Sequence, residues 1–212
     1  DTGLPQILIE CGTEILWGGG SPLEAAVRGA RDAYAEGGLR ASGCTALGRQ
    51  NLGGEIPVSV EYIPLEGDRA TVYTLAKGGG CDNKSRLVNL PPTAGREEAV
   101  RAAVDAATAA GPDACPPFYL GICVGGTFES APRYARRALW DILWGDPPSP
   151  EEASFASEVA EILNASGLGP MCVGGRTTVL GVRAAVRPTH IASLPVAVNL
   201  CCHSFRPGRA VI

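Results

Sequence analysis

Glycine and proline divide this chain into short segments, and this division limits what it can fold into. The 212 residues include 28 glycines and 17 prolines, which lie between short apolar stretches. Glycine allows backbone angles that other residues avoid, and proline ends helices and central strands. The combined content is below the range typical of low-complexity disorder. The pattern therefore predicts a globular protein with many tight turns and close backbone contacts.

Composition excludes several classes of function. The chain has a net charge of −4, an isoelectric point near 5.3 and no basic tract, so nucleic acid is not an expected partner. It has no apolar run long enough to span a bilayer and no visible secretory signal, so no membrane association is expected. Hydrophobic residues make up 45% of the chain, which is ordinary for a globular protein whose length suits one domain.

Hydrophobic periodicity and capping residues predict a mixture of helices and strands. The expected helices span 22–36, 97–110, 131–144 and 150 to about 167. The expected strands span 7–11, 58–65, 70–76, 118–124, 177–186 and 191–200, with a hairpin turn at 66–68. Helices and strands do not alternate strictly, so the predicted fold class is α+β. We expect a mixed β-sheet flanked by helices in a single compact domain over residues 1–212.

The chain has eight cysteines and no C-x-x-C pair. A disulfide framework is disfavoured, because the chain is long enough for a core and has no secretory context. Buried reduced cysteine is the default, and Cys123, within the apolar strand 118–124, fits it. A metal site would need dispersed ligands that the fold gathers. The cysteines are Cys11, Cys44, Cys81, Cys115, Cys123, Cys172, Cys201 and Cys202.

A run of three glycines, 78–80, follows a predicted strand. The N–H groups of Gly79 and Gly80 could form a nest that holds an anion such as a carboxylate. The same run could instead be a loop against which another backbone packs closely. It is neither a P-loop nor a dinucleotide fingerprint, since the residue orders that those motifs require are absent.

Three further residues each have two interpretations. Cys115 precedes Pro116 and Pro117, which would present a thiolate rigidly or simply form the turn into a strand. His190, at a predicted strand start, is either a hydrogen-bonded structural residue or a catalytic one. Arg40 follows a helix end, either as a solvated surface residue or as a bidentate carboxylate clamp.

Taken together, the order and spacing of these segments resemble the iron–sulfur hydro-lyases, which are the class I fumarate hydratases and L(+)-tartrate dehydratases. The resemblance is to the α subunit of the two-subunit forms, equivalent to the N-terminal domain of the single-chain forms. It runs from Asp1 to about Arg206. The segments that carry it are Asp1-Thr2-Gly3, Leu39-Arg40-Ala41-Ser42, Gly78-Gly79-Gly80, Cys115-Pro116-Pro117, Gly125-Gly126-Thr127 and the stretch from His190 to Pro195.

The resemblance implies a [4Fe–4S] cluster with three cysteine ligands. Cys115 matches the second ligand, and Cys202, twelve residues after His190, matches the third, with Cys201 as the neighbour that could be mistaken for it. The first belongs to a Cys-Gln-Asp-Thr-Gly motif and is expected just before Asp1, so the domain is expected to lack an N-terminal segment. An iron without a protein ligand would act as a Lewis acid.

The remaining family residues are carried over one at a time. Asp1 and His190 match catalytic residues that lie near the substrate, and Arg40, Gly79 and Gly80 match substrate-binding positions. Two positions depart from the family: a serine is often found where this chain has Cys81, and a glycine is usual where it has Cys172.

The implied function is reversible hydration of a C4 dicarboxylate, foremost fumarate to L-malate in the tricarboxylic acid cycle, in a reducing cytoplasm. L(+)-tartrate dehydration and mesaconate hydration are the close alternatives. The resemblance also implies a β subunit that supplies the candidate base, an arginine and a lysine. The expected assembly is α2β2 or one built on a homodimeric α core.

Two interpretations of a different class stay open at this point. Cys115, Cys202 and His203 could bind zinc in a non-catalytic domain, because zinc takes tetrahedral sulfur and nitrogen ligands. The chain could also be a structural α+β domain with eight buried thiols.

Overall fold

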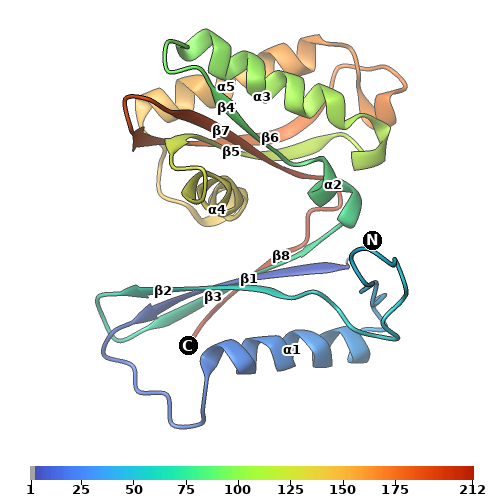
Figure 1. Ribbon diagram of the computed structural model, residues 1–212, viewed down its shortest axis with the longest axis vertical. Coiled ribbons are helices and arrows are strands. Elements are labelled where there is room, and N and C mark those ends of the chain that lie inside the picture. Colours follow the sequence, from blue (N-terminus) through green and yellow to red (C-terminus); the bar gives the residue numbers. More distant parts are fainter. Residues whose placement is uncertain (1–2) are drawn as a thin grey trace. The chain divides into compact units, whose positions relative to one another are not determined.

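The computed structural model describes residues 3–212, and the chain folds into two compact units (Figure 1). Unit 1 comprises Asp1–Gly79 and Phe205–Ile212, and unit 2 comprises Gly80–Ser204. The predicted α+β class, with mixed sheets flanked by helices, is confirmed. The strands form two four-stranded sheets, one in each unit, a division that the sequence patterns did not reveal.

Unit 1 is a four-stranded sheet with one helix along a face (Figure 1). The strand order is β2-β1-β3-β8; β1 pairs with β2 in parallel and with β3 in antiparallel orientation. Ile7 and Ile9 pack with Ala26 and Ala30 of the helix. The helix has the predicted bounds because the Ser21 side chain caps it, Pro22 begins it and Gly37 ends it. The elements are β1 (Leu4–Gly12), α1 (Pro22–Glu36), β2 (Ser59–Leu65), β3 (Ala70–Lys77) and β8 (Pro207–Val211).

The predicted hairpin at 66–68 is wrong. Strands β2 and β3 do not pair, because β1 lies between them. The end of β1 and the residues after it bond to the turn instead: the Gly12 N–H donates to the Arg69 carbonyl at 2.8 Å, and the Glu14 N–H donates to the Gly67 carbonyl at 3.0 Å. A Cβ at Gly12 would lie 2.2 Å from the Gly67 oxygen. Only glycine therefore allows this approach.

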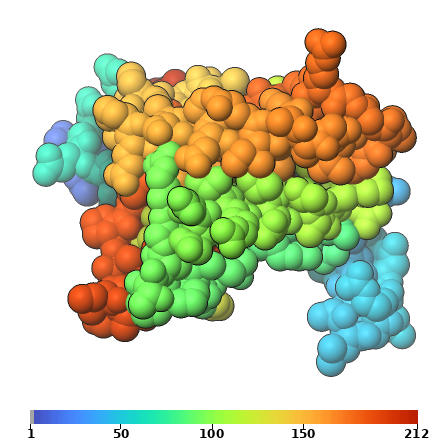
Figure 2. All heavy atoms as spheres, turned by 90° about the horizontal axis from the view of Figure 1, so that it is seen from above, coloured from blue at the N-terminus to red at the C-terminus, as the bar shows by residue number. Residues whose placement is uncertain are grey.

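Unit 2 is a three-layered body with helices on both faces of a sheet of order β4-β7-β5-β6. Helices α3 and α5 cover one face and α4 covers the other (Figure 1). Figure 2 looks onto the first face, where the green band of α3 and the orange band of α5 lie side by side. The elements are α2 (Gly79–Lys84), β4 (Arg86–Leu90), α3 (Arg96–Ala110), β5 (Phe118–Gly126), α4 (Ser130–Trp144), α5 (Pro150–Ala165), β6 (Val179–Thr189) and β7 (Leu194–Cys201).

Small residues bring the layers of unit 2 into close contact. A Cβ at Gly121 of β5 would lie 2.0 Å from the carbonyl oxygen of Ala135 in α4. On the other face, the buried side of α3 consists largely of alanines such as Ala99, Ala103 and Ala107. Backbones can approach closely where no long side chain separates them. This packing explains why glycine is required at Gly121.

Three short elements were not predicted. The six-residue helix α2 was interpreted as a glycine-rich turn, and the five-residue strands β4 and β8 were assigned no structure. Neither strand shows the strict alternation of apolar and polar residues that predicts a strand, since their sequences are RLVNL and PGRAV. The other predicted elements agree with the structure to within a few residues at their ends.

We expect Gly12→Ala to destabilise the protein by about 1–3 kcal/mol, because the added methyl group must displace the backbone at Gly67. Gly29→Ala is the matched control, since nothing lies within 4 Å of a Cβ at this helical position. The control should stabilise the protein by about 0.5–1 kcal/mol. Urea unfolding followed by circular dichroism measures both changes. Equal stability of Gly12→Ala and the parent would contradict the packing described for β1.

Candidate functional site

The pairing of two central strands places two cysteines at one end of the unit 2 sheet. Strand β5 begins shortly after Cys115, and β7 ends immediately before Cys202. The strands are antiparallel, with Tyr119 opposite Cys201. The His203 Nδ1 lies 3.3 Å from the Cys115 carbonyl oxygen, so the two segments are in contact. We call this end of the sheet, defined by Cys115 and Cys202, the thiol end.

Neighbouring cysteines at the end of β7 differ in exposure. Successive side chains of a strand point to opposite faces. Cys201 is 1% exposed and belongs to the core, whereas Cys202 is partly exposed. Cys115 is also partly exposed. Burial therefore distinguishes Cys202 from Cys201 as the thiol that an incoming group can reach.

Cys115 has a constrained backbone. Its φ of 53° lies in the left-handed region, at the end of the 3₁₀ turn Pro112–Ala114. Its N–H donates to the Pro112 carbonyl at 2.9 Å. Few non-glycine residues adopt this conformation, and those that do cluster at functional sites. The left-handed conformation and this hydrogen bond constrain the backbone that carries the thiol, and both interpretations of Cys115 remain compatible with them.

The glycine run packs against the same turn. A Cβ at Gly80 would lie 2.6 Å from the Asp113 carbonyl oxygen, the Cys81 thiol donates to the Ala114 carbonyl at 3.2 Å, and Lys84 forms an ion pair with Asp113 at 3.0 Å. Close backbone packing, one of the two interpretations of this run, is thus observed at Gly80. A serine hydroxyl could donate as the Cys81 thiol does, so Cys81 can replace it without loss of this bond.

A further cysteine lies in a segment bonded to the Cys115 turn. The Met171 N–H donates to the Pro116 carbonyl at 3.0 Å, and Cys172 follows. Cys172 has a φ of 59°, a conformation that favours glycine. This explains why glycine is usual there in the family that the chain resembles. Within residues 3–212, no three metal-ligating side chains gather around one point.

Unit 1 has its own cavity, of about 390 Å³. It collects residues from three separate segments that the sequence singled out: Gly3 follows Asp1, Ser42 follows Arg40, and Gly79 begins α2. Arg40 itself is exposed. Asp1 lies outside the described residues. The lining residues are Gly3, Leu4, Ser42, Gly43, Cys44, Arg49, Leu52, Glu55, Ile56, Pro57 and Gly79.

Arg49 lines this cavity and was missed by sequence reasoning. Its φ is 52°, and its N–H donates to the Thr45 carbonyl at 3.0 Å. The Thr45 N–H in turn donates to the Gln50 carbonyl at 2.9 Å. These bonds fix the backbone that carries the guanidinium. The only sequence signal was an arginine within a glycine-rich segment, which does not distinguish it from a surface residue.

His190 lies at the other end of the unit 2 sheet. It precedes β7, and its Nδ1 accepts a hydrogen bond from the Ala192 N–H at 3.1 Å. Strand β7 has eight residues, and at about 3.3 Å per residue the thiol end is about 25 Å away. One copy of the chain therefore does not bring His190 together with Cys115 and Cys202.

Comparison with known proteins places the chain in a family. Residues 1–211 match the model of the family described as fumarate hydratase (Fumerase). The match covers nearly the whole chain, with both sites described above. The chain belongs to this family of hydro-lyases.

Relatives with curated names are α subunits. The putative L(+)-tartrate dehydratase subunit alpha of Methanocaldococcus jannaschii is 30% identical over 97% of this chain and 74% of its own length. The L(+)-tartrate dehydratase subunit alpha of Escherichia coli K12 is 29% identical over 77% of this chain and 54% of its own length. The chain thus spans about half the length of the Escherichia coli relatives that it matches.

The helices were also compared with the requirements of a bilayer. No helix within residues 3–212 combines the length and the hydropathy needed to cross a membrane.

We expect thiol reagents to distinguish the cysteines of the folded protein. At pH 8, iodoacetamide should modify Cys115 and Cys202 but not Cys201 or Cys123. Burial raises the pKa of the Cys123 thiol to about 11, so it stays protonated and unreactive. Mass spectrometry of the digested protein measures each position. Faster modification of Cys201 than of Cys202 would contradict the assignment of faces.

The raised pKa of Cys123 also predicts a pH dependence of stability. Below about pH 9 the thiol is protonated in both states and contributes no pH dependence. Above that pH it ionises first in the unfolded chain, so stability falls until the folded thiol ionises near pH 11. Cys123→Ala should reduce the slope of unfolding free energy against pH over this window. An unchanged slope would show that Cys123 ionises equally in both states.

Proposed function

We propose that this chain is the α subunit of an iron–sulfur hydro-lyase that reversibly hydrates a C4 dicarboxylate, with fumarate and L-malate as the leading substrate pair. The observation that supports this most directly is the thiol end. Two partly exposed cysteines lie there in segments that contact each other through His203 and the Cys115 carbonyl, and both match positions where the resemblance requires cluster ligands, while Cys123 and Cys201 are buried.

The thiols of Cys115 and Cys202 fit a [4Fe–4S] cluster, which thiolates hold. A bound cluster with one open iron would supply a Lewis acid for the substrate hydroxyl. The third ligand is proposed to lie just before Asp1, as the resemblance implies. The zinc alternative would need Cys115, Cys202 and His203 around one ion.

Substrate binding is proposed for the residues that the resemblance selects. The Arg40 guanidinium and the N–H groups of Gly79 and Gly80 would hold carboxylates, because charge-assisted hydrogen bonds to carboxylates are strong and directional. Arg49 adds a second guanidinium in the same unit, on the wall of the cavity that Gly79 lines. Two guanidinium groups would suit a dicarboxylate.

Proton transfer is proposed for Asp1 and His190, together with a base from a partner subunit. For His190 the proposal has a condition. Because it lies at the opposite end of the sheet from Cys115, it could act on a substrate at the thiol end only of another copy of the chain. This condition agrees with the expected assembly, α2β2 or one with a homodimeric α core.

The partner and the location follow from the same proposal. The named relatives are α subunits, and we propose a β subunit that completes the active site. An exposed cluster is sensitive to oxidants, so we propose a reducing cytoplasm as the location and the tricarboxylic acid cycle as the pathway when fumarate is the substrate.

L(+)-Tartrate is the second candidate substrate, because the relatives described above carry the name L(+)-tartrate dehydratase. The same arginines and N–H groups would serve a substrate with one more hydroxyl. Mesaconate would require room for a methyl group.

The function is tested by an anaerobic activity panel. We expect the chain co-expressed with its β subunit to act on fumarate and L-malate or on L(+)-tartrate, and the chain alone to be inactive because it lacks the partner's base. D(−)-tartrate and mesaconate complete the panel. Full activity of the isolated chain would exclude the need for a β subunit, and inactivity of the pair on all substrates would exclude the proposed function.

The ligand assignment is tested separately. We expect Cys115→Ser and Cys202→Ser to lose most of the iron and acid-labile sulfide after anaerobic reconstitution, because a hydroxyl is a poor ligand for these clusters. Cys201→Ser and Cys123→Ser are matched controls that should retain both. Iron and sulfide analysis measures the result without any activity assay. Retention of the cluster in Cys202→Ser would exclude this ligand.

A further inference from the structure

Exposed apolar side chains lie at one end of unit 1, on and beside the loop between β1 and α1 (Figure 1). In the loop, Leu16 is 93% exposed and Trp17 is 39% exposed. Strand β2 adds Tyr62, which is 37% exposed, and Leu65, which is 46% exposed. We call the surface that these four residues form the β1–α1 surface.

Backbone and side-chain bonds bring these residues together. The Thr13 N–H donates to the Leu65 carbonyl at 2.8 Å, so the loop starts beside the end of β2. The indole N–H of Trp17 forms a hydrogen bond with the Tyr62 hydroxyl. Single exposed apolar residues are ordinary, but neighbouring ones that form a surface mark sites where other proteins bind. Trp and Tyr are also enriched among the residues that contribute most to such contacts.

The loop is fixed at its base and open beyond Trp17. Ile15 packs against the core that β1 and α1 share. By contrast, a Cβ at Gly18 or at Gly19 would meet nothing within 4 Å. The packed base therefore directs Leu16 and Trp17 outward, and the glycines that follow leave room for a partner to approach.

Acidic side chains border the β1–α1 surface. Glu14 in the loop and Glu66 and Asp68 in the turn after β2 are exposed. The Glu14 N–H donates to the Gly67 carbonyl at 3.0 Å, which places the loop and the turn side by side. Arg69 is the only basic residue of these two segments. An apolar centre with a negative border is complementary to a partner with a positive border.

This charge disfavours three kinds of occupant. The carboxylates repel nucleic acid and the anionic headgroups of a bilayer. A second copy of the chain is also disfavoured, because a twofold dimer places the same patch against itself and would bring the two acidic borders together. The surface therefore fits a different protein, with Lys and Arg arranged around an apolar centre.

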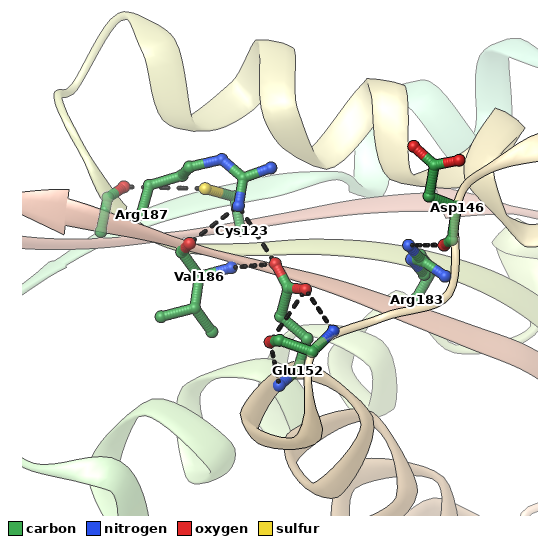
Figure 3. A network of polar contacts seen from close by, with 8 residues as sticks. Cys123, Asp146, Glu152, Arg183, Val186 and Arg187 are labelled. Atoms are coloured by element: carbon green, nitrogen blue, oxygen red, sulfur yellow. Dashed lines mark hydrogen bonds and ion pairs between the residues drawn. The ribbon is translucent and has the colours of Figure 1, made fainter.

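The outer strand of the unit 2 sheet, β6, differs because its edge is bonded to its own chain (Figure 3). The Glu152 Oε1 accepts from the Val186 N–H at 3.1 Å and from the Arg187 Nη1 at 3.0 Å. A partner strand cannot pair with an edge group that is already bonded. Strand β6 therefore supplies a control position, Leu180, which is 48% exposed.

The β1–α1 surface is separate from the unit 1 cavity. Leu4 begins β1 and lines the cavity, whereas Gly12 ends β1 and precedes the loop. At about 3.3 Å per residue, the strand separates the two by about 26 Å. Contacts at this surface can therefore hold a partner without touching a substrate in the cavity.

We propose that the β1–α1 surface binds the β subunit, through a patch on that subunit with an apolar centre and a border of Lys and Arg. Leu16 and Trp17 supply the apolar contact, and Glu14, Glu66 and Asp68 face the basic border. The identity of the partner rests on the proposed function. The surface adds an anchoring contact about 26 Å from the unit 1 cavity, along the length of β1.

Dilution of the complex co-purified with the β subunit measures the contact. Sedimentation velocity over a range of concentrations yields the dissociation constant. Trp17→Ser and Leu16→Ser should each weaken association by about tenfold or more, as expected when a central apolar contact is truncated. Leu180→Ser is the matched control and should associate as the parent does. Circular dichroism verifies that each variant is folded.

Charge reversal tests the border. The double variant Glu66→Lys with Asp68→Lys should weaken association at low salt, because the reversed charges repel a basic border. The effect should shrink at about 0.5 M salt, where exposed charges are screened. Glu161→Lys, at an exposed position of α5, is the control for a change of charge.

A photoreactive side chain identifies the occupant directly. Benzoylphenylalanine in place of Leu16, which is 93% exposed, should crosslink to the β subunit when the complex is irradiated. Mass spectrometry of the crosslinked peptides should locate the site on that subunit among apolar residues with Lys or Arg nearby. The same substitution at Leu180 is the control and should give no such crosslink.

Four results would overturn the proposal. They are unchanged dissociation constants in both Trp17→Ser and Leu16→Ser, unchanged or tighter association after charge reversal, a crosslink to a second copy of the chain instead of the β subunit, and the absence of any complex. Only the last would also remove the β subunit from the proposed function. A complex that the variants weaken but that is inactive on every substrate would overturn the hydro-lyase proposal alone.

Discussion

The antiparallel pairing of β5 and β7 is the constraint on which the candidate chemistry of unit 2 depends. Tyr119 opposite Cys201 fixes the register, and the register decides which residues leave the sheet at each end. A slip of one residue would exchange the faces of Cys201 and Cys202. The exposure of Cys202 comes from the strand end, because Cys202 lies just beyond β7, whereas Cys201 is the last residue of the strand and is buried. Strand pairing thus selects the sulfur atom available for chemistry.

Close packing by small residues maintains this register. Gly121 allows the backbone of α4 to rest on β5, and the alanines of α3 allow the opposite layer to approach in the same way. Such an interior has little freedom to adjust, because every substitution adds atoms where backbones already touch. The same principle operates locally at Gly80, which lets α2 pack against the turn before Cys115.

Local sequence signals predicted the elements well and their assembly poorly. Ser21 and Pro22 defined the start of α1, and the capping box at Ser149 defined the start of α5, because capping depends only on neighbouring residues. The hairpin at 66–68 failed because a third strand, β1, entered between its arms. No pattern near the turn predicts that another strand takes this pairing, because β1 lies about fifty residues earlier in the chain.

The candidate site shows the same difference between what sequence patterns predict and what only the assembled fold reveals. Spacing relative to known motifs selected Cys115 and Cys202, and strand topology then placed both at one end of the sheet. The motif spacing also selected His190, but only the strand order reveals that this residue lies at the other end of the sheet from Cys115 and Cys202. Arg49 had no distinguishing signal, because its place on the cavity wall depends on the backbone conformation of a loop.

Strand β8 has a consequence for the order in which the chain is completed. Since β8 returns to pair with β3, unit 2 is inserted within unit 1, from Gly80 to Ser204. Both ends of the insertion contact one turn, Gly80 at Asp113 and His203 at Cys115. During synthesis, the fourth strand of the unit 1 sheet is therefore made only after the whole of unit 2.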